Sequence, residues 1–231
     1  MLHPEAAILL FAKAPLKGRV KTRLIPVLGA DRATRLYRDL LRHQLERLSQ
    51  AGLASLELWC APDTTHPEFL SLRRELGVSL HPQQGVDLGE RMAVAAGDAL
   101  WRYRSVLLLG VDSPGLTLNM IEQALDELAE GREAVLGPAE DGGYVLLGLK
   151  RTAACLFRDI PWGGDRVAAT TRQCLDRLGW RWHELPESWD LDRPQDLVRL
   201  TSLEWGRAWV ANQTLPSELA VWFERASPDG P

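Results

Sequence analysis

Residues 105–114 read Ser-Val-Leu-Leu-Leu-Gly-Val-Asp-Ser-Pro, and this stretch decides the fold class. Ser105–Leu109 is a short, mostly apolar run, which is typical of a strand buried on both faces of a parallel sheet. A tight turn at Pro114 follows and carries Asp112. We therefore expect Asp112 at the carboxyl end of a central strand, the edge at which ligands bind in open α/β sheets.

Further short apolar runs alternate with helical patterns, which is the signature of βαβ units and a mainly parallel sheet. In Asp31–Ser49 the apolar residues recur at the i, i+3, i+4, i+7 spacing of one helix face. The other expected strands are Ala6–Phe11, Ser55–Cys60, Val78–His81, Ala134–Leu136, Tyr144–Leu149 and Arg181–Leu185. The other expected helices are Gly89–Trp101, Asn119–Ala129, Arg166–Leu178 and Arg193–Leu203. The sequence predicts an α/β fold with helices on both faces of the sheet.

Length and composition are those of an ordinary globular protein. The chain has 231 residues, 45% of them hydrophobic, and a formal net charge of −4. This length suits one α/β domain, which we expect over residues 1–205, with residues 206–231 as a helical tail of the same domain. The net negative charge argues against a general nucleic-acid binder. The amphipathic tail leaves open whether the chain acts as a monomer or a homodimer.

The cellular setting follows from the cysteines and the first apolar run. Ala6–Ala12 is too short to span a membrane, and no basic segment precedes it, so we expect a soluble cytoplasmic protein. The three cysteines form no CxxC pair and are odd in number, which fits reduced thiols better than disulfides or a zinc site. They are Cys60, Cys155 and Cys174.

The loop after the first strand is strongly basic. Its five cations, with no acid among them, are Lys13, Lys17, Arg19, Lys21 and Arg23. On an acidic protein this cluster predicts a phosphate site, with Lys21 and Arg23 on phosphate oxygens and Gly18 allowing close backbone approach. It is not a Walker A loop, because Val20 stands where a glycine must precede Lys21. A solvated basic loop is the alternative.

Three aspartates are candidate metal ligands. Asp112 suits Mg²⁺, which prefers one or two carboxylates completed by substrate phosphates and water. The alternative role for Asp112 is to cap its own turn. Asp190 and Asp192 lie on one side of an extended segment. We favour Asp192 as the second ligand over Asp190, although Asp192 also precedes a helix that it could cap.

Glycine motifs and tryptophans complete the candidate site. Asp141-Gly142-Gly143-Tyr144 joins two strands; it is either a hairpin turn or a pocket rim in which Asp141 binds or deprotonates a substrate hydroxyl. Trp162 is a candidate for sugar stacking, although large aromatic residues more often pack in cores. The segment that opens the helix Gly89–Trp101 supplies Gln84, Gly89 and Arg91 as candidate nucleotide contacts.

Together these motifs resemble a bacterial family of GT-A-like nucleotide-diphospho-sugar transferases, the arsenosugar-biosynthesis-type glycosyltransferases. The resemblance spans most of residues 6–200 and ends near residue 205. The matching segments are Phe11-Ala-Lys-Ala-Pro15, Gly18-Arg-Val-Lys-Thr-Arg-Leu24, Leu88-Gly-Glu-Arg-Met92, Gly110-Val-Asp-Ser-Pro114, Gly137-Pro138, Asp141-Gly-Gly-Tyr144, Ile160-Pro-Trp162 and Asp190-Leu-Asp192.

The resemblance implies a Rossmann-like GT-A-type fold and a Mg²⁺ or Mn²⁺ ion, held here by Asp112 and Asp192. One departure is that Asp112 is followed by Ser113 and Pro114 rather than by the second carboxylate of an Asp-x-Asp pair. The sequence Lys21-Thr-Arg-Leu24 is also similar to the Lys-Ser-Arg-Leu of phospholactate guanylyltransferases, a family related in shape.

Three functions remain as hypotheses. The leading one is glycosyl transfer from a nucleotide sugar to a small-molecule acceptor, with Asp112, Lys21 and Asp141 in catalytic roles. The second is nucleotidyl transfer from a nucleoside triphosphate to a phosphorylated acceptor, with release of pyrophosphate. The third is a non-catalytic nucleotide-binding protein.

Overall fold

The computed structural model describes residues 1–212, which form two compact units. The first unit contains residues 1–14 and 38–190, and the second contains residues 15–37 and 191–212 of the described chain. Residues 213–231 lie outside the described residues, so the predicted tail is seen only in part. The division into a domain over 1–205 and a tail stays a prediction.

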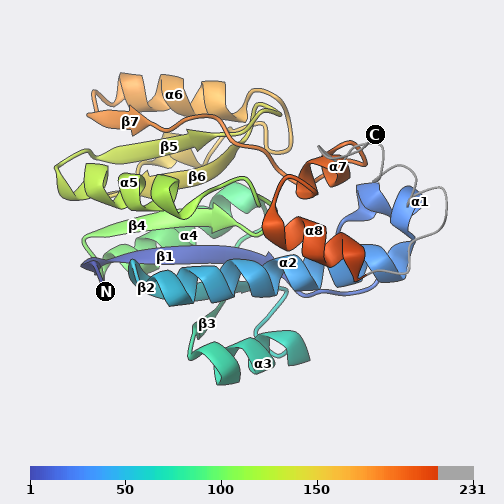
Figure 1. The fold of residues 1–231 in the computed structure, drawn as a ribbon. Helices are drawn as coiled ribbons and strands as arrows, with labels where there is room; N and C mark the ends of the chain where they lie inside the picture. Colours follow the sequence, from blue (N-terminus) through green and yellow to red (C-terminus); the bar gives the residue numbers. More distant parts are fainter. Residues whose placement is uncertain (213–231) are drawn as a thin grey trace. The chain divides into compact units, whose positions relative to one another are not determined.

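The first unit contains a seven-stranded sheet in the order β3-β2-β1-β4-β6-β5-β7 (Figure 1). Its strands are β1 (His3–Lys13), β2 (Ala54–Ala61), β3 (Ser79–Pro82), β4 (Ser105–Gly110), β5 (Ala134–Pro138), β6 (Tyr144–Leu149) and β7 (Trp182–Glu184). The predicted α/β fold with a mainly parallel sheet is confirmed.

Strand β6 is the antiparallel member of this sheet. It pairs antiparallel with both β4 and β5, whereas the other neighbouring strands pair in parallel. From β1 the chain builds outward to β2 and β3, and it then returns to place β4 on the other side of β1. The order therefore reverses between β1 and β4, and in open α/β sheets the carboxyl ends at such a switch point form a ligand-binding crevice.

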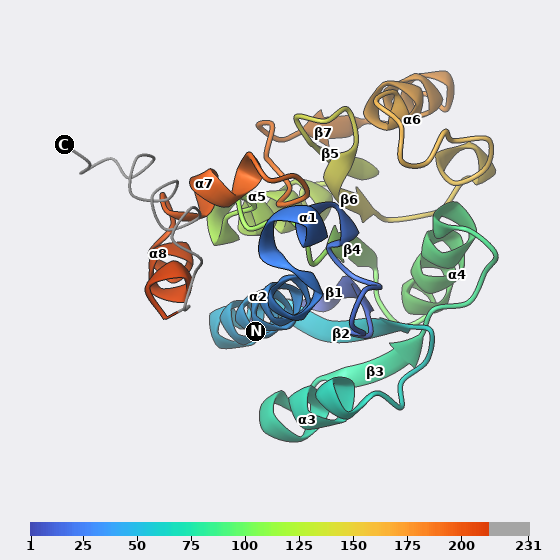
Figure 2. The same ribbon diagram turned by 90° about the vertical axis from the view of Figure 1, so that its right-hand side faces the viewer.

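Helices cover both faces of the sheet, with α4 and α6 on one face and α2 and α5 on the other (Figure 2). Side chains alternate along each strand, so Ala7, Leu9, Val106 and Leu108 all pack into the core against α4 and α6. The helices and 3-10 turn that lie in this unit are α3 (Pro67–Leu76), α4 (Leu88–Leu100), α5 (Leu118–Ala129), η2 (Ala154–Leu156) and α6 (Val167–Arg177). Helix α2 (Ala30–Ala51) runs through both units.

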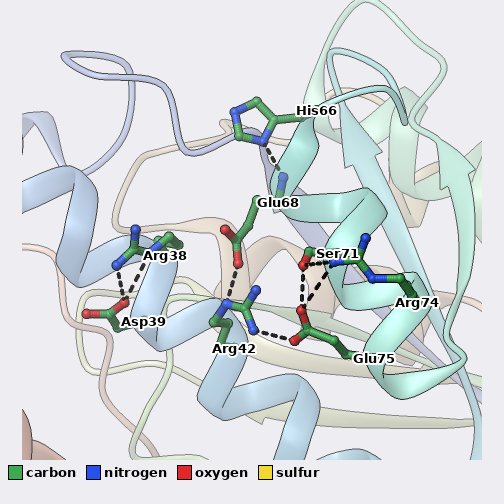
Figure 3. A network of polar contacts seen from close by, with 8 residues as sticks. All are labelled: Arg38, Asp39, Arg42, His66, Glu68, Ser71, Arg74 and Glu75. Atoms are coloured by element: carbon green, nitrogen blue, oxygen red, sulfur yellow. Dashed lines mark hydrogen bonds and ion pairs between the residues drawn. The ribbon is translucent and has the colours of Figure 1, made fainter.

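Helix α3 lies in a segment for which the sequence predicted no element. His66 caps it by accepting a hydrogen bond at Nδ1 from the Glu68 backbone amide, at 3.2 Å. Arg42 of α2 then pairs with Glu68 and Glu75, with its Nε 2.5 Å from Glu68 Oε1 and its Nη1 2.7 Å from Glu75 Oε2 (Figure 3). The hydrogen bond from Arg42 lowers the pKa of Glu75 to about 2.

The second unit is helical in its described part. It contains η1 (Thr22–Leu24), α1 (Ile25–Leu28), α7 (Asp196–Leu200) and α8 (Glu204–Ala211). The helix predicted over Arg193–Leu203 is confirmed in part, because α7 lies within that range but is shorter. The carboxylate of Asp196 accepts hydrogen bonds from the backbone amides of Asp192 at 3.0 Å and Arg193 at 2.6 Å, which delays the start of α7. Asp192 therefore does not cap this helix.

The cysteines differ from the prediction. Cys155 in η2 and Cys174 in α6 form a disulfide, with their Cα atoms 5.9 Å apart, so the expectation of reduced thiols is wrong for this pair. The two residues are 19 positions apart, and they meet because η2 packs against α6. Cys60 remains a buried thiol, and burial raises its pKa to about 12.

Within residues 1–212, no helix is both long enough and apolar enough to cross a bilayer.

Candidate functional site

A cavity of about 230 Å³ opens at the switch point of the sheet, where β1 and β4 end and β6 begins. Several residues singled out from the sequence line it, and all the lining residues described belong to the first unit. They are Phe11, Leu88, Met92, Leu108, Leu109, Gly110, Asp141, Gly143, Tyr144, Val145, Trp162, Gly163, Gly164, Val167 and Asp190. The cavity is apolar apart from its two carboxylates and a tyrosine.

Two aromatic side chains form a rigid wall of this cavity. The rings of Tyr144 and Trp162 pack edge to face, with their centroids 6.2 Å apart and an interplanar angle of 81°. The Tyr144 hydroxyl donates to Met92 Sδ at 3.7 Å. Burial raises the pKa of Tyr144 above its ordinary value, so the phenol is neutral near pH 7.

Asp141 is fixed by its own turn. The Gly143 amide donates to Asp141 Oδ1 at 2.9 Å. Gly142 has φ +87°, and a Cβ added there would lie 2.0 Å from the Asp165 carbonyl oxygen. The Gly142 carbonyl also accepts a hydrogen bond from the Ala168 amide at 2.9 Å. The glycine pair therefore anchors the Asp141 loop to the start of α6, and Gly142 itself packs against protein backbone.

Asp190 is held at the cavity by two links. The segment before it bridges the end of β5, because the Ser188 amide donates to the Pro138 carbonyl at 2.9 Å and the Ser188 carbonyl accepts from the Glu140 amide at 3.0 Å. The Ser113 hydroxyl then donates to Asp190 Oδ1. Asp190 thereby joins the turn after β4, which carries Asp112, to the loop that carries Asp141.

Side chains of α2 donate hydrogen bonds to backbone carbonyls of the turn that carries Asp112 and of the residues just after it. Gln44 Nε2 donates to the Ser113 carbonyl at 3.2 Å, and Arg47 donates to the Leu116 carbonyl. Asp112 is exposed at the tip of this turn, and Ser113 beside it is buried. Within the described part of the chain, no three His, Cys, Asp or Glu side chains cluster as a preformed metal site.

The segment that opens α4 is held by hydrogen bonds and by packing. A Cβ added at Gly89 would lie 2.1 Å from the Phe157 carbonyl oxygen and 2.5 Å from Trp162 Nε1, so this glycine makes room for the aromatic wall. Arg91 Nε donates to the Gly85 carbonyl at 3.0 Å. Gln84 is exposed. The roles of Gln84, Gly89 and Arg91 in nucleotide binding stay predictions.

The basic loop is divided between the two units. Lys13 ends β1 in the first unit and is exposed, whereas Gly18, Lys21 and Arg23 belong to the second. Lys21 has a left-handed backbone with φ 48°, is buried, and donates through Nζ to the Leu191 carbonyl.

Gly18, Arg23 and Asp192, the other candidate site residues in the second unit, each have a partner or a backbone role. Gly18 is exposed with φ +75°, a conformation that favours glycine. Arg23 pairs with Asp192 within the second unit. The predicted phosphate-binding roles of Gly18, Lys21 and Arg23, and the metal role of Asp192, stay predictions.

Sequence reasoning missed part of the cavity wall. Phe11 and Met92 lie inside the matching motifs but are not among the predicted site residues, and neither are Gly163 and Gly164. Asp190 was ranked below Asp192. The adjacent Ile160-Pro-Trp162 motif was the available signal for the two glycines, whereas the hydrogen bond from Ser113 to Asp190 joins residues 77 positions apart and left no sequence signal.

Comparison with solved structures supports the fold. A Desulfovibrio desulfuricans protein, provisionally assigned as a nucleotide-diphospho-sugar transferase, is 31% identical, with 98% of this chain and 100% of that one covered and a TM-score of 0.81. A cytidylyltransferase from Leptospira borgpetersenii is 13% identical over 93% of this chain and 100% of that one, with a TM-score of 0.56, which shows the fold alone. The structural neighbours are thus transferases with GT-A-like folds.

Two sequence comparisons place the chain among its relatives. It is 32% identical over 136 residues to a phosphoenolpyruvate guanylyltransferase of Frankia casuarinae, an alignment that covers 58% of this chain and 45% of that protein. Residues 44–164 match the model of a family described as "Uncharacterized protein conserved in bacteria (DUF2064)". The match covers more than half of the sequence, and the chain therefore belongs to the bacterial DUF2064 family.

Proposed function

We propose that this chain is a metal-dependent transferase that moves a group from a nucleotide-activated donor, with a nucleotide sugar as the leading donor class, to a small acceptor. One observation carries the proposal. The hydrogen bond from Ser113 to Asp190 joins the acidic turn at the switch point of the sheet to the wall of the cavity. The Desulfovibrio relative also supports the proposal, because its assignment names such a donor and its similarity extends over 98% of this chain.

The donor atoms near this turn suit a hard divalent cation. Asp112 and Asp190 offer carboxylate oxygens, and Mg²⁺ takes one or two carboxylates together with phosphate oxygens and water rather than a complete protein cage. The absence of a three-residue cluster among residues 1–212 is consistent with that mode. When bound, Mg²⁺ or Mn²⁺ supplies positive charge to the leaving phosphate. The sequence also predicts Asp192 as a metal ligand, and we keep that role as a separate proposal.

Asp141 is the candidate base. Its Oδ1 is occupied by the Gly143 amide, which fixes the carboxylate at the cavity wall. In glycosyl transfer the acceptor oxygen bonds to the anomeric carbon while the bond from that carbon to the phosphate oxygen breaks. The electron pair leaves with the nucleoside diphosphate, and the acceptor proton passes to Asp141.

Tyr144 and Trp162 are proposed to hold the acceptor against Asp141, because their rings form the rigid wall beside it. Rigid placement of an acceptor next to its base lowers the entropic part of the barrier. In the second unit, Lys21 and Arg23 are proposed to bind phosphate oxygens.

Nucleotidyl transfer is the second candidate, and the Frankia relative is the observation that favours it. The two reactions differ in their products, because glycosyl transfer releases a nucleoside diphosphate and nucleotidyl transfer releases pyrophosphate. Purified protein is incubated with Mg²⁺ or Mn²⁺, a panel of nucleotide sugars and triphosphates, and small acceptors, and both products are quantified.

The proposal expects diphosphate release that Asp112→Asn abolishes and Asp126→Asn leaves unchanged. Asp126 is the matched control because it lies on α5, is largely exposed, and pairs with His3 outside the cavity. Pyrophosphate release would establish the second candidate instead. Tight nucleotide binding with neither product would favour the non-catalytic hypothesis.

A further inference from the structure

The charges that line the cavity restrict the acceptor. The ionisable groups on its wall, apart from the Tyr144 phenol, are the carboxylates of Asp141 and Asp190. Among the lining residues that the structure describes there is no lysine, arginine or histidine. We propose that, if the transferase activity proposed above holds, the acceptor is an alcohol that carries neither a phosphate nor a carboxylate group.

The two carboxylates are held in place rather than free to swing away. Asp141 Oδ1 accepts from the Gly143 amide at 2.9 Å, and Asp190 Oδ1 accepts from the buried Ser113 hydroxyl. An anionic group placed between them would meet like charge and lose its hydration without gaining a cationic side chain of the described lining as a partner. The wall therefore disfavours phosphate esters and carboxylic acids.

The arginine of α4, Arg91, already has a hydrogen-bond partner. Arg91 directs its Nε to the Gly85 carbonyl at 3.0 Å and does not line the cavity. Lys150, which follows β6, donates to the Leu128 carbonyl at 3.1 Å and also lies outside the lining. Neither side chain offers the cavity a cation for an acid group.

The same wall favours a hydroxylated group. A hydroxyl donates a charge-assisted hydrogen bond to a carboxylate, and such bonds are about twice as strong as neutral ones. The Tyr144 and Trp162 rings, 6.2 Å apart, and the thioether of Met92 offer apolar surface to carbon atoms of the same molecule. The acceptor oxygen can then lose its proton to Asp141 as it bonds to the transferred group, whose bond to the leaving phosphate breaks.

The prediction is tested with pairs of acceptors in which one member is neutral and the other carries a phosphate. The full chain is incubated with Mn²⁺, the donors that it consumes and one acceptor at a time. One pair of acceptors is glycerol and glycerol 3-phosphate, and the other is methyl glucoside and glucose 6-phosphate. We expect transfer to the neutral member of a pair at a rate at least about tenfold above the anionic member. Asp190→Asn should reduce the ratio of the two acceptors' affinities about tenfold, because one repelling charge is removed; affinities are compared because Asp190 is also a proposed metal ligand.

Two further variants complete the design. Asp141→Asn removes the proposed base, so the affinities of the two members of each pair are compared in place of their rates; the preference for the neutral member should fall, and this variant serves if Asp190→Asn fails to fold. Asp126→Asn, outside the cavity, should leave the ratio unchanged. Faster transfer to the anionic members overturns the inference. It is also overturned if the protein consumes the donor and no neutral alcohol increases the rate of consumption above that of donor hydrolysis alone. If no nucleotide is bound or consumed at all, the proposed function fails instead, and the two failures are thus distinguished.

Discussion

The hydroxyl of Ser113 donates a hydrogen bond to Oδ1 of Asp190, across 77 positions of sequence. This contact joins the turn after β4 to the segment that follows β7, and together with the backbone bonds of Ser188 it holds one of the two cavity carboxylates in place. Ser113 does not itself line the cavity, so we regard it as a positioning residue that acts through Asp190.

Ser113→Ala should weaken metal binding in the presence of nucleotide about tenfold, because it removes the partner that orients a proposed ligand. Loss of the hydrogen bond should also lower the free energy of unfolding by about 1 kcal/mol. The matched control is Ser105→Ala, a buried serine at the opposite end of β4. Titration of Mn²⁺ checks the affinity, and an equal loss in both variants would contradict the positioning role.

Gly89→Ala should damage the cavity, because the new Cβ would lie 2.1 Å from the Phe157 carbonyl oxygen and 2.5 Å from Trp162 Nε1. We expect a lower Tm and weaker acceptor binding. In the same helix Gly97→Ala meets no atom within 4 Å and should raise the free energy of unfolding by about 0.5–1 kcal/mol. Thermal melts and acceptor titrations of both variants test this; a fully active Gly89→Ala protein would exclude the packing role.

The disulfide between Cys155 and Cys174 closes the segment that contains Trp162, Gly163 and Gly164 of the cavity wall. In the denatured, unreduced protein we expect one reactive thiol, Cys60, and three after reduction. A closed loop of this length contributes about 3 kcal/mol in the chain-entropy model, so Cys155→Ser with Cys174→Ser should unfold at lower temperature. Three thiols before reduction would show that the bond does not form.

His43 on α2 should make stability depend on pH. Burial, with a smaller contribution from the positive charge of Arg47, lowers its pKa from 6.5 to about 4. Between these values the unfolded chain binds a proton that the folded chain does not, so stability should fall as the pH falls through this window. His43→Gln should reduce the drop in Tm between about pH 7 and pH 4.5. An identical drop in both proteins would rule out His43 as the cause.

The sequence predicted what periodicity and local composition encode. The apolar runs placed the strands, and Ser105–Leu109 is indeed central, between β1 and β6. The order of the strands and the antiparallel direction of β6 depend on pairing between distant segments, which local patterns do not contain. Helix α3 was missed although His66 and Gly77 flank it, because its pattern is short and follows a loop.

The candidate site was predicted in part for the same reason. Asp141, Gly143, Tyr144 and Trp162 were found from local motifs and do meet at one cavity. The preference for Asp192 over Asp190 as a metal ligand follows the resemblance to the transferase family, in which Asp192 is the better match. In the structure Asp190 lines the cavity and Asp192 pairs with Arg23. Both placements depend on contacts between residues far apart in the sequence, which local patterns do not contain.

Ligand-dependent thermal stability tests the central claim most directly. The protein is melted with Mg²⁺ or Mn²⁺ and a panel of nucleotide sugars, nucleoside diphosphates and triphosphates, alongside Asp112→Asn and the control Asp126→Asn. A ligand at a hundred times its Kd adds about 2.7 kcal/mol. The account predicts metal-dependent stabilisation by a nucleotide sugar that Asp112→Asn loses and Asp126→Asn keeps. No stabilisation by any nucleotide, with either metal, would contradict it.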